Sequence, residues 1–411
     1  SLKRHGFTVA VLPDEWSSAA GGVDIAIGSR TAVFARVPDL RSIVVIDEHD
    51  DSLREERTPT WHARDVAIER ASQASVSCIL MSALPSVSAT VWAGDRVLKS
   101  DEQEVQSEWP HIQLIDRTLD ERWSNSLLSS DFIAELRDHA RRIVVVLNTK
   151  GRARLLACAS CKSLARCASC DAAVEIDAEG QFSCPRCSTK RPQVCIKCSS
   201  AKFLTLKPGV SKLREEIAQA AGRNVSDVVE VTGGGDDATA IDQAKMLFVG
   251  TEAALHRVHE ADTVVFLDID QELMAPRYRA SEIVGSLLVH AARLVGRSDR
   301  GGKVMVQTHS IDSPVLQAMV ALRIDHYLHS VSEMRSFMKL PPFGALAQLS
   351  GTNIDDAIQE LQRNVFVHVS ASSDGSYLVK AADWKVLADA LNEVEASKGV
   401  RLKVQVDPAR V

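Results

Sequence analysis

The sequence predicts an α/β protein with parallel sheets, an inserted cysteine module and a small α+β domain at its C-terminus. Three observations predict this fold. Apolar runs alternate with helical patterns, eight cysteines interrupt that alternation, and a proline-containing break at Leu340–Gly344 precedes a fresh strand, helix and strand sequence.

The expected strands are rich in valine and isoleucine, and their apolar residues are continuous, which is typical of parallel strands buried on both faces. We expect strands at Ser42–Ile46, Ile143–Leu147, Val228–Val231, Met246–Val249, Thr263–Leu267 and Lys303–Val306. Helical patterns that open near a capping Ser, Thr or Asp cover Trp61–Ala74, Ser130–Arg142, Ser211–Ala221 and Ser281–Arg297.

The domain boundaries follow from where this alternation stops. The cysteine module begins after the strand ending at Leu147, and the pattern resumes near Ser211, as expected for an insertion within a domain. Gly233–Asp237 is expected to be a flexible loop. The predicted domains are a first lobe over 1–125, a second lobe over 126–157 and 210–335, the inserted module over 158–209, and the α+β domain over 336–411.

Composition narrows the functional classes. The chain has 411 residues, 45% of them hydrophobic, and a net charge of −6, which suits a globular protein of two or three domains. It contains no run of about 18 apolar residues, so we expect no membrane span. The first residues lack the apolar core of a signal peptide, which favours the cytoplasm. Because the chain begins with Ser1 and not Met, we expect residues upstream of it.

Eight of the nine cysteines form four CxxC pairs. The pairs are Cys158/Cys161, Cys167/Cys170, Cys184/Cys187 and Cys195/Cys198. Disulfide frameworks are typical of small secreted domains, and a redox site needs only one CxxC, whereas four regular pairs fit closed Cys₄ zinc sites. We therefore predict two Zn²⁺ ions per chain. The ninth, Cys78, lies in an apolar run and is expected to be core packing.

Spacing suggests how the pairs combine. Only five residues separate Cys161 from Cys167, whereas thirteen separate Cys170 from Cys184 and can form a hairpin. The predicted inner zinc site is Cys167, Cys170, Cys184 and Cys187, and the predicted outer site is Cys158, Cys161, Cys195 and Cys198. Sequential pairing remains the alternative.

Charge is concentrated in and around the module. Between Lys150 and Arg214 there are thirteen Lys or Arg and four Asp or Glu, a formal charge of +9, so the remainder of the chain carries −15. Eight zinc-bound thiolates and two Zn²⁺ ions would lower the charge of this segment to about +5. This segregation predicts nucleic-acid contact, and the alternative is a solvated module that touches only protein. Phe182 and Phe203 are expected to fill the core of the module.

Several segments along the chain carry recognisable motifs: Lys150–Cys158 with the cysteine order that follows, Gly28–Phe34, Val45–His49, His62–Asp65, Phe266–Asp270, Val306–His309, Leu340–Pro342 and Val406–Pro408. Together they resemble the replication-restart PriA family (primosomal protein N′). The resemblance covers essentially the whole chain. It implies two RecA-like helicase lobes, the first truncated at its N-terminus, with the zinc module inserted in the second.

The helicase motifs depart from the family pattern. No GxxxxGK[ST] phosphate loop is present. Asp47–Asp50 stands where the family has DEEH, Met81–Pro85 where it has GSATP, Gly250–Arg257 where it has GTQxxxKG, and His290–Arg297 where it has QxxGRxGR. In the last of these, Leu294 and Arg293 differ while Arg297 is retained. ATP hydrolysis needs such groups in place, so we assign no catalytic residue and leave ATP binding open.

The leading hypothesis is a replication restart primosome protein without helicase or ATPase activity. It would recognise stalled or branched forks, bind DNA at single-stranded and double-stranded junctions, and contact primosome and replicative-helicase loading proteins in the cytoplasm, at the nucleoid. The alternative is an active ATP-dependent 3′-to-5′ DNA helicase whose phosphate loop lies upstream. A third hypothesis is a zinc-binding chaperone with repeated CxxC pairs, but this hypothesis does not explain the flanking α/β lobes.

Overall fold

The computed structural model describes residues 2–58, 60–119, 127–147, 155–177, 179–205, 210–231, 241–275, 277–352, 354–372, 375–398 and 402–408. Two of the sequence expectations, the Gly233–Asp237 loop and the Lys150–Arg154 segment, fall outside these ranges. The chain divides into two compact units. Unit 1 contains Ser1–Val97 with Leu328–Pro408, and unit 2 is built around Leu98–Tyr327.

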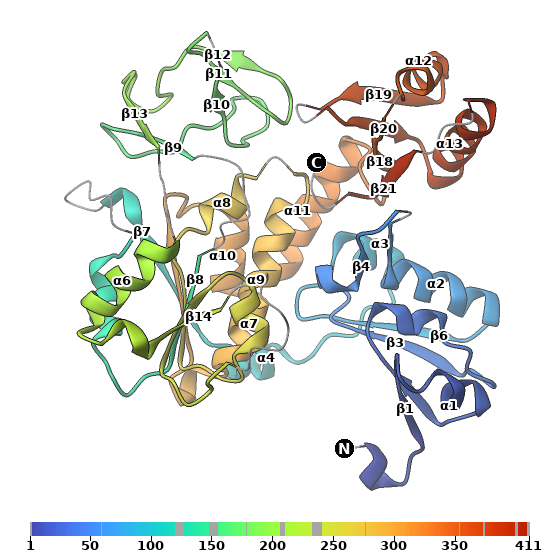
Figure 1. The fold of residues 1–411 in the computed structure, drawn as a ribbon, viewed down its shortest axis with the longest axis horizontal. Helices are drawn as coiled ribbons and strands as arrows, with labels where there is room; N and C mark the ends of the chain where they lie inside the picture. The colour runs from blue at the N-terminus through green and yellow to red at the C-terminus, as the bar shows by residue number, and fades with distance from the viewer. Residues whose placement is uncertain are drawn as a thin grey trace. The chain divides into compact units, whose positions relative to one another are not determined.

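Unit 2 is organised around a six-stranded parallel sheet (Figure 1). The strand order is β14 (Val228–Val231), β15 (Leu247–Gly250), β8 (Ile143–Val146), β16 (Thr263–Phe266), β17 (Lys303–Thr308) and β7 (His111–Asp116). Every residue of β8, β15 and β16 is buried, as their continuous apolar runs predict.

Helices cover both faces of this sheet (Figure 1). On one face, α5 (Ser130–Leu136) and α6 (Val210–Ala221) contribute Phe132, Leu136 and Ile217 to a core shared with the strands. On the other lie α7 (Ala253–Arg257) and α9 (Ala280–Val295), where nine of the sixteen α9 residues are buried. α4 (Glu102–Glu108) and α10 (Pro314–Ala321) complete the unit with the first turn of α11 (Ile324–Phe337), whose remaining turns belong to unit 1.

One close approach in this sheet requires glycine. A Cβ atom at Gly250 would lie 1.9 Å from the carbonyl oxygen of Val231 on the neighbouring strand. Since this is far inside van der Waals contact, any side chain at the end of β15 would separate β14 from β15.

The N-terminal part of unit 1 contains three two-stranded sheets: β1 (Val9–Val11) with β2 (Ile25–Ile27), β3 (Ser42–Ile46) with β6 (Ser77–Met81), and β4 (Arg54–Glu55) with β5 (Trp61–His62). The accompanying helices are α1 (Trp16–Gly21), α2 (Ala63–Ala74) and α3 (Val87–Ala93). α2 packs on β3 and β6.

One face of the β3–β6 sheet is apolar and exposed to solvent. Val44 pairs with Ile79 and Ile46 with Met81, and these four side chains are 48–66% exposed. Parallel strands are normally covered on both sides, so this face departs from the usual rule in the described part of the chain.

The C-terminal part of unit 1 is an antiparallel sheet with two helices. The strand order is β19 (Val367–Ala371), β20 (Tyr377–Ala381), β18 (Ala345–Ser350) and β21 (Lys403–Val406). α12 (Asp355–Arg363) and α13 (Trp384–Lys398) bury Ile358, Leu361 and Leu387 against it. The predicted α/β class, the parallel sheet and the small α+β region are confirmed.

The predicted domain limits remain a prediction, and two of them, 125/126 and 335/336, differ from the division into units, which falls at 97/98 and 327/328. β7 pairs with β17 in the sheet of unit 2, so the division falls at 97/98 and not at 125/126. The sequence of β7, His-Ile-Gln-Leu-Ile-Asp, lacks the continuous valine and isoleucine run that marks the other strands, because it lies at the edge of the sheet. No helix among the described residues has the length and apolarity to cross a membrane.

Two buried carboxylates, Asp268 and Asp270, form an acidic centre just beyond the carboxyl end of β16. The chain turns in opposite directions from β8 and β16, and such a switch point is where open parallel sheets commonly bind ligands. Asp270 accepts hydrogen bonds from the Thr308 hydroxyl (2.8 Å), the Ser310 hydroxyl (2.6 Å) and the His309 amide (2.7 Å). Burial and the neighbouring Asp270 raise the pKa of Asp268 to about 7.

This raised pKa predicts a pH-dependent stability. The native state holds the Asp268 proton up to about pH 7, whereas an unfolded aspartate loses it near pH 3.9, so the free energy of unfolding falls as pH rises between these values. We expect Asp268→Asn to become progressively more stable than the parent from pH 5 to pH 7, with a constant difference above that. Urea unfolding at several pH values measures it.

The control for this prediction is Asp312→Asn, because Asp312 is exposed nearby. This variant also removes one carboxylate, so the comparison separates the effect of burying Asp268 from the loss of a negative charge. A pH-independent difference for Asp268→Asn would contradict burial as the cause of the raised pKa.

Candidate metal centre

The four CxxC pairs fold into four similar turns. In each, the amide of the first cysteine donates to the carbonyl of the residue five positions later, at 2.8–3.0 Å. The residue after each second cysteine is left-handed, with φ between 57° and 61°; these residues are Lys162, Asp171, Ser188 and Ser199. This repeated backbone turns both sulfurs of a pair toward one point, as in a zinc knuckle.

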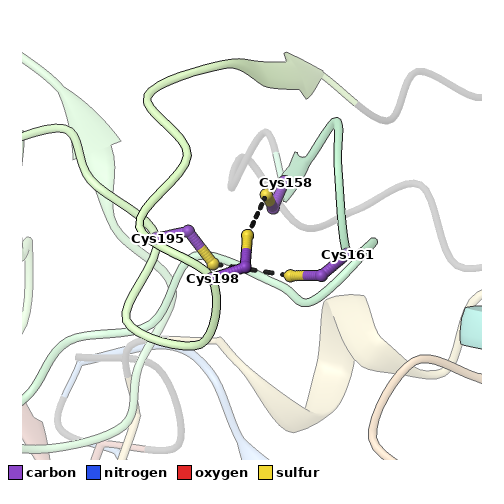
Figure 2. A group of neighbouring side chains, drawn as sticks. All are labelled: Cys158, Cys161, Cys195 and Cys198. Carbon is purple, nitrogen blue, oxygen red and sulfur yellow. Dashed lines mark hydrogen bonds between the residues drawn. The ribbon is translucent and has the colours of Figure 1, made fainter.

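The turns combine into two groups of four sulfurs, each with all ligand atoms within 4.8 Å of one another. The outer cluster contains Cys158, Cys161, Cys195 and Cys198 (Figure 2), and the inner cluster contains Cys167, Cys170, Cys184 and Cys187. Sulfurs of different turns are 3.4–3.5 Å apart. The grouping is therefore the nested one, first pair with last and second with third.

These distances fit zinc and exclude disulfides. A disulfide requires about 2.05 Å between sulfurs, whereas a tetrahedron with Zn–S bonds of about 2.3 Å places them about 3.8 Å apart. The first cysteine of every pair is buried, and the second is half-buried or exposed. Two tetracysteine clusters of this geometry are consistent with the two Zn²⁺ ions predicted from the sequence, which would be closed, structural sites.

Each cluster contains a thiol suited to deprotonation. Burial opposes ionisation of Cys195, but hydrogen bonds from the Ser163 hydroxyl and from backbone amides outweigh it and lower its pKa to about 6. The Thr189 hydroxyl and amide have the same effect on Cys187, whose pKa is also lowered to about 6 against the effect of burial. A thiolate is the form that binds metal, so each cluster has a ready first ligand at neutral pH.

A small aromatic core supports the inner cluster. Phe182 is fully buried and packs edge-on against Phe203, with ring centroids 4.8 Å apart. The Arg191 guanidinium covers the Phe182 ring at 4.6 Å. The expectation that both phenylalanines fill the core is confirmed, and Phe182 has no free face for a nucleic-acid base.

The retained helicase-motif residues of unit 1 are engaged in internal contacts. Glu48 is fully buried and accepts hydrogen bonds from the Ser86 amide (2.6 Å), the Ser86 hydroxyl (2.8 Å) and Arg64 (3.2 Å). His49 is hydrogen-bonded to Ser82 at 2.6 Å, so the segment after β3 is tied to the segment after β6. Asp47 has a left-handed backbone, with φ of 55°.

The motif residues of unit 2 are also engaged. Arg297 forms ion pairs with Asp299 and Glu108 at 3.0 Å on the surface. His256 and His290, which occupy the lysine and glutamine positions of two family motifs, stack with ring centroids 4.6 Å apart. The structure thus gives both changed positions a packing role.

Sequence reasoning missed several residues that organise these regions. Arg64, Ser86 and Ser163 act through partners that lie far away in the sequence, so no local pattern reveals them. Asp268 and Asp270 had a usable signal, because two acids directly after a fully apolar strand lie at the ligand-binding edge of a parallel sheet.

Comparisons with known proteins agree with the sequence resemblance. No family model matches the chain. Curated proteins named replication restart protein PriA match from Haemophilus influenzae (26% identity, 80% of this chain, 47% of that protein), Synechocystis (27%, 85%, 46%) and Bacillus subtilis (25%, 97%, 51%). The chain spans about half the length of these relatives.

Among solved structures, a variant of S. cerevisiae Dbp5 bound to RNA and ADP BeF₃ matches with a TM-score of 0.40 and 13% identity, over 82% of this chain and 74% of that one.

The nested grouping predicts the metal content of a double variant. Cys158→Ser with Cys195→Ser removes two ligands of the outer cluster and none of the inner one. We expect the purified variant to hold one Zn²⁺ per chain where the parent holds two, measured by plasma emission spectrometry. The matched control, Cys167→Ser with Cys184→Ser, should also hold one. Loss of both ions in a variant that remains folded would contradict independent sites.

Proposed function

We propose that the chain, which is similar to proteins named replication restart protein PriA, is a DNA-binding replication restart protein. It recognises stalled or branched forks and helps reload the replicative helicase, in contact with primosome proteins, in the cytoplasm at the nucleoid. In this proposal the eight cysteines hold two structural Zn²⁺ ions that order the module, and the chain acts without ATPase activity of its own.

The environment of Glu48 is the observation that best supports the proposed lack of ATPase activity. A carboxylate that activates or orients a water molecule must be reached by that water. Glu48 is fully buried, and both its oxygens accept hydrogen bonds from Ser86 or Arg64. Breaking a buried ion pair by moving one partner costs about 3–5 kcal/mol. Glu48 is therefore a structural residue that holds β3 to the start of α3.

The arginine of the final motif supports the same proposal. An arginine finger must be free to approach the transferring phosphate. Arg297 is instead held in two surface ion pairs, and the half-buried Leu294 stands at the neighbouring arginine position of the family motif.

The second candidate is an active ATP-dependent 3′-to-5′ DNA helicase. Asp47 favours it, because this residue directly follows β3, at the carboxyl end where parallel sheets bind ligands. Surface ion pairs such as those of Arg297 are also weak, at about 0–1 kcal/mol, and a nucleotide could displace them.

Measurement of ATP hydrolysis distinguishes the two candidates. We expect the full-length protein to show no hydrolysis above background with or without forked DNA, and Asp47→Asn to leave this unchanged. Zinc content and fork binding serve as controls for folding. Robust DNA-stimulated hydrolysis that Asp47→Asn abolishes would overturn the proposal and establish the helicase.

The DNA contact is proposed for the basic surface near the outer cluster. Lys197 lies within the last CxxC pair and Lys202 just after it, and both side chains are exposed. Lys190, also exposed, differs because Asp177 (3.0 Å) and Glu179 (3.6 Å) already neutralise it. Lys197 and Lys202 are thus the better candidates to bind phosphate.

This assignment predicts a change in salt dependence. Each lysine–phosphate contact contributes nearly one unit to the slope of log affinity against log salt concentration. We expect Lys197→Ala with Lys202→Ala to weaken fork binding on the order of tenfold at low salt and to reduce the slope by about two. Lys190→Ala, in the same module, should change the slope little. A slope equal to that of the parent would place the DNA elsewhere.

A further inference from the structure

The cysteine module is packed against unit 2 beside the acidic centre. Leu164 and Ala173 of the module form one buried cluster with Met274, which follows α8 (Asp270–Leu273). Leu155 and Ala157, just before the module, belong to the same cluster. The Ala173 amide donates to the Met274 carbonyl at 3.0 Å. Figure 1 shows the strands at the module grouped together on the side of the sheet where α8 lies. They are β9 (Leu156–Cys158), β10 (Glu175–Ile176), β11 (Phe182–Ser183), β12 (Lys190–Arg191) and β13 (Phe203–Thr205). Backbone and apolar contacts therefore both fix the module to α8.

A chain of polar contacts runs from the inner cluster to the acidic centre. Arg166, the residue before Cys167, donates through Nη2 to the Ser310 hydroxyl at 2.6 Å. Ser310 is buried and donates its own proton to Asp270, also at 2.6 Å. Since a hydroxyl has a single proton, the bond accepted from Arg166 directs that proton toward Asp270.

Arg166 is itself held in place from within the module. Its Nη1 donates to Asp171 at 3.0 Å, and its carbonyl accepts a hydrogen bond from Arg191 at 2.9 Å. Asp171 is the left-handed residue that completes the Cys167/Cys170 turn. The position of the Arg166 guanidinium therefore depends on a turn that a metal ion in the inner cluster would stabilise.

We propose that Arg166 is a positioning residue that couples metal binding at the inner cluster to the order of the acidic centre and of the Thr308–Ser310 segment. With metal bound, the turn holds Arg166 against Ser310, and Ser310 and His309 hold the Asp270 carboxylate. Without it, nothing joins the Cys167/Cys170 turn to the Cys184/Cys187 turn through their four sulfurs, so the first turn loosens and Arg166 leaves Ser310. This inference goes beyond the proposed function, since it requires neither DNA binding nor an inactive motor.

The coupling must act in both directions, because a linkage between two sites is reciprocal. Metal in the inner cluster stabilises the Ser310–Asp270 contact, so loss of that contact must weaken metal retention at the inner cluster. Ser310→Ala tests this direction without altering any residue of the module.

The experiment uses the zinc-loaded full-length chain and two readouts. Chelator-driven zinc release, followed with a chromogenic indicator, should be on the order of tenfold faster in one of its two phases for Arg166→Ala and for Ser310→Ala. Amide hydrogen exchange at His309, whose amide donates to Asp270, should accelerate by a similar factor in both variants while two Zn²⁺ remain bound. Arg166→Lys, which can still donate to Ser310, should recover part of each effect.

The matched control is Arg186→Ala. Arg186 lies between Cys184 and Cys187 of the same inner cluster, so it tests for a general loss of charge near the metal. It should leave both readouts unchanged. Parent-like zinc release and exchange in Ser310→Ala would overturn the proposal, and so would equal effects in Arg186→Ala and Arg166→Ala. If Arg166→Ala fails to fold, Ser310→Ala decides alone.

Discussion

The arrangement of this protein depends on the mutual repulsion of eight sulfur atoms gathered in two small volumes. Two thiolates 3.5 Å apart repel by about 5 kcal/mol at the effective dielectric constant of a protein surface. Such clusters persist only if the thiols keep their protons or a cation balances the charge. Closed groups of four cysteine sulfurs are typical of the second solution, with zinc as the cation. A divalent cation then becomes part of the fold.

The sequence predicted those parts of the fold that local chemistry determines. The six strands expected from continuous apolar runs were found within one or two residues. In unit 2 the runs at β8, β15 and β16 are buried throughout, as expected, whereas the expected burial of β3 on both faces was wrong. The cysteine spacing favoured the nested grouping that the structure has, since five residues leave little chain for folding one knuckle back on the next. β7 was not predicted, because an edge strand alternates polar and apolar residues and carries a weaker signal.

The long-range contacts that determine the roles of Glu48 and Arg166 could not be predicted from local sequence. Glu48 accepts hydrogen bonds from Arg64 in α2 and from Ser86 at the start of α3. These residues come close to Glu48 only when the chain folds. Arg166 looked like one more basic residue of a basic module, and its contact with Ser310 spans 144 positions. These roles were missed because the contacting residues are far apart in the sequence, although the contacts themselves are ordinary hydrogen bonds and ion pairs.

The exposed apolar face of β3 and β6 has a consequence for how the protein behaves at high concentration. This face is an exposed hydrophobic patch formed by Val44, Ile46, Ile79 and Met81. Exposed patches of this kind on short strands promote self-association. The excess negative charge outside the cysteine segment opposes it, since like-charged molecules repel at a distance. Colloidal stability should thus be poorest in mildly acidic, high-salt solutions, where the carboxylates are partly neutralised and screened and the hydrophobic attraction remains.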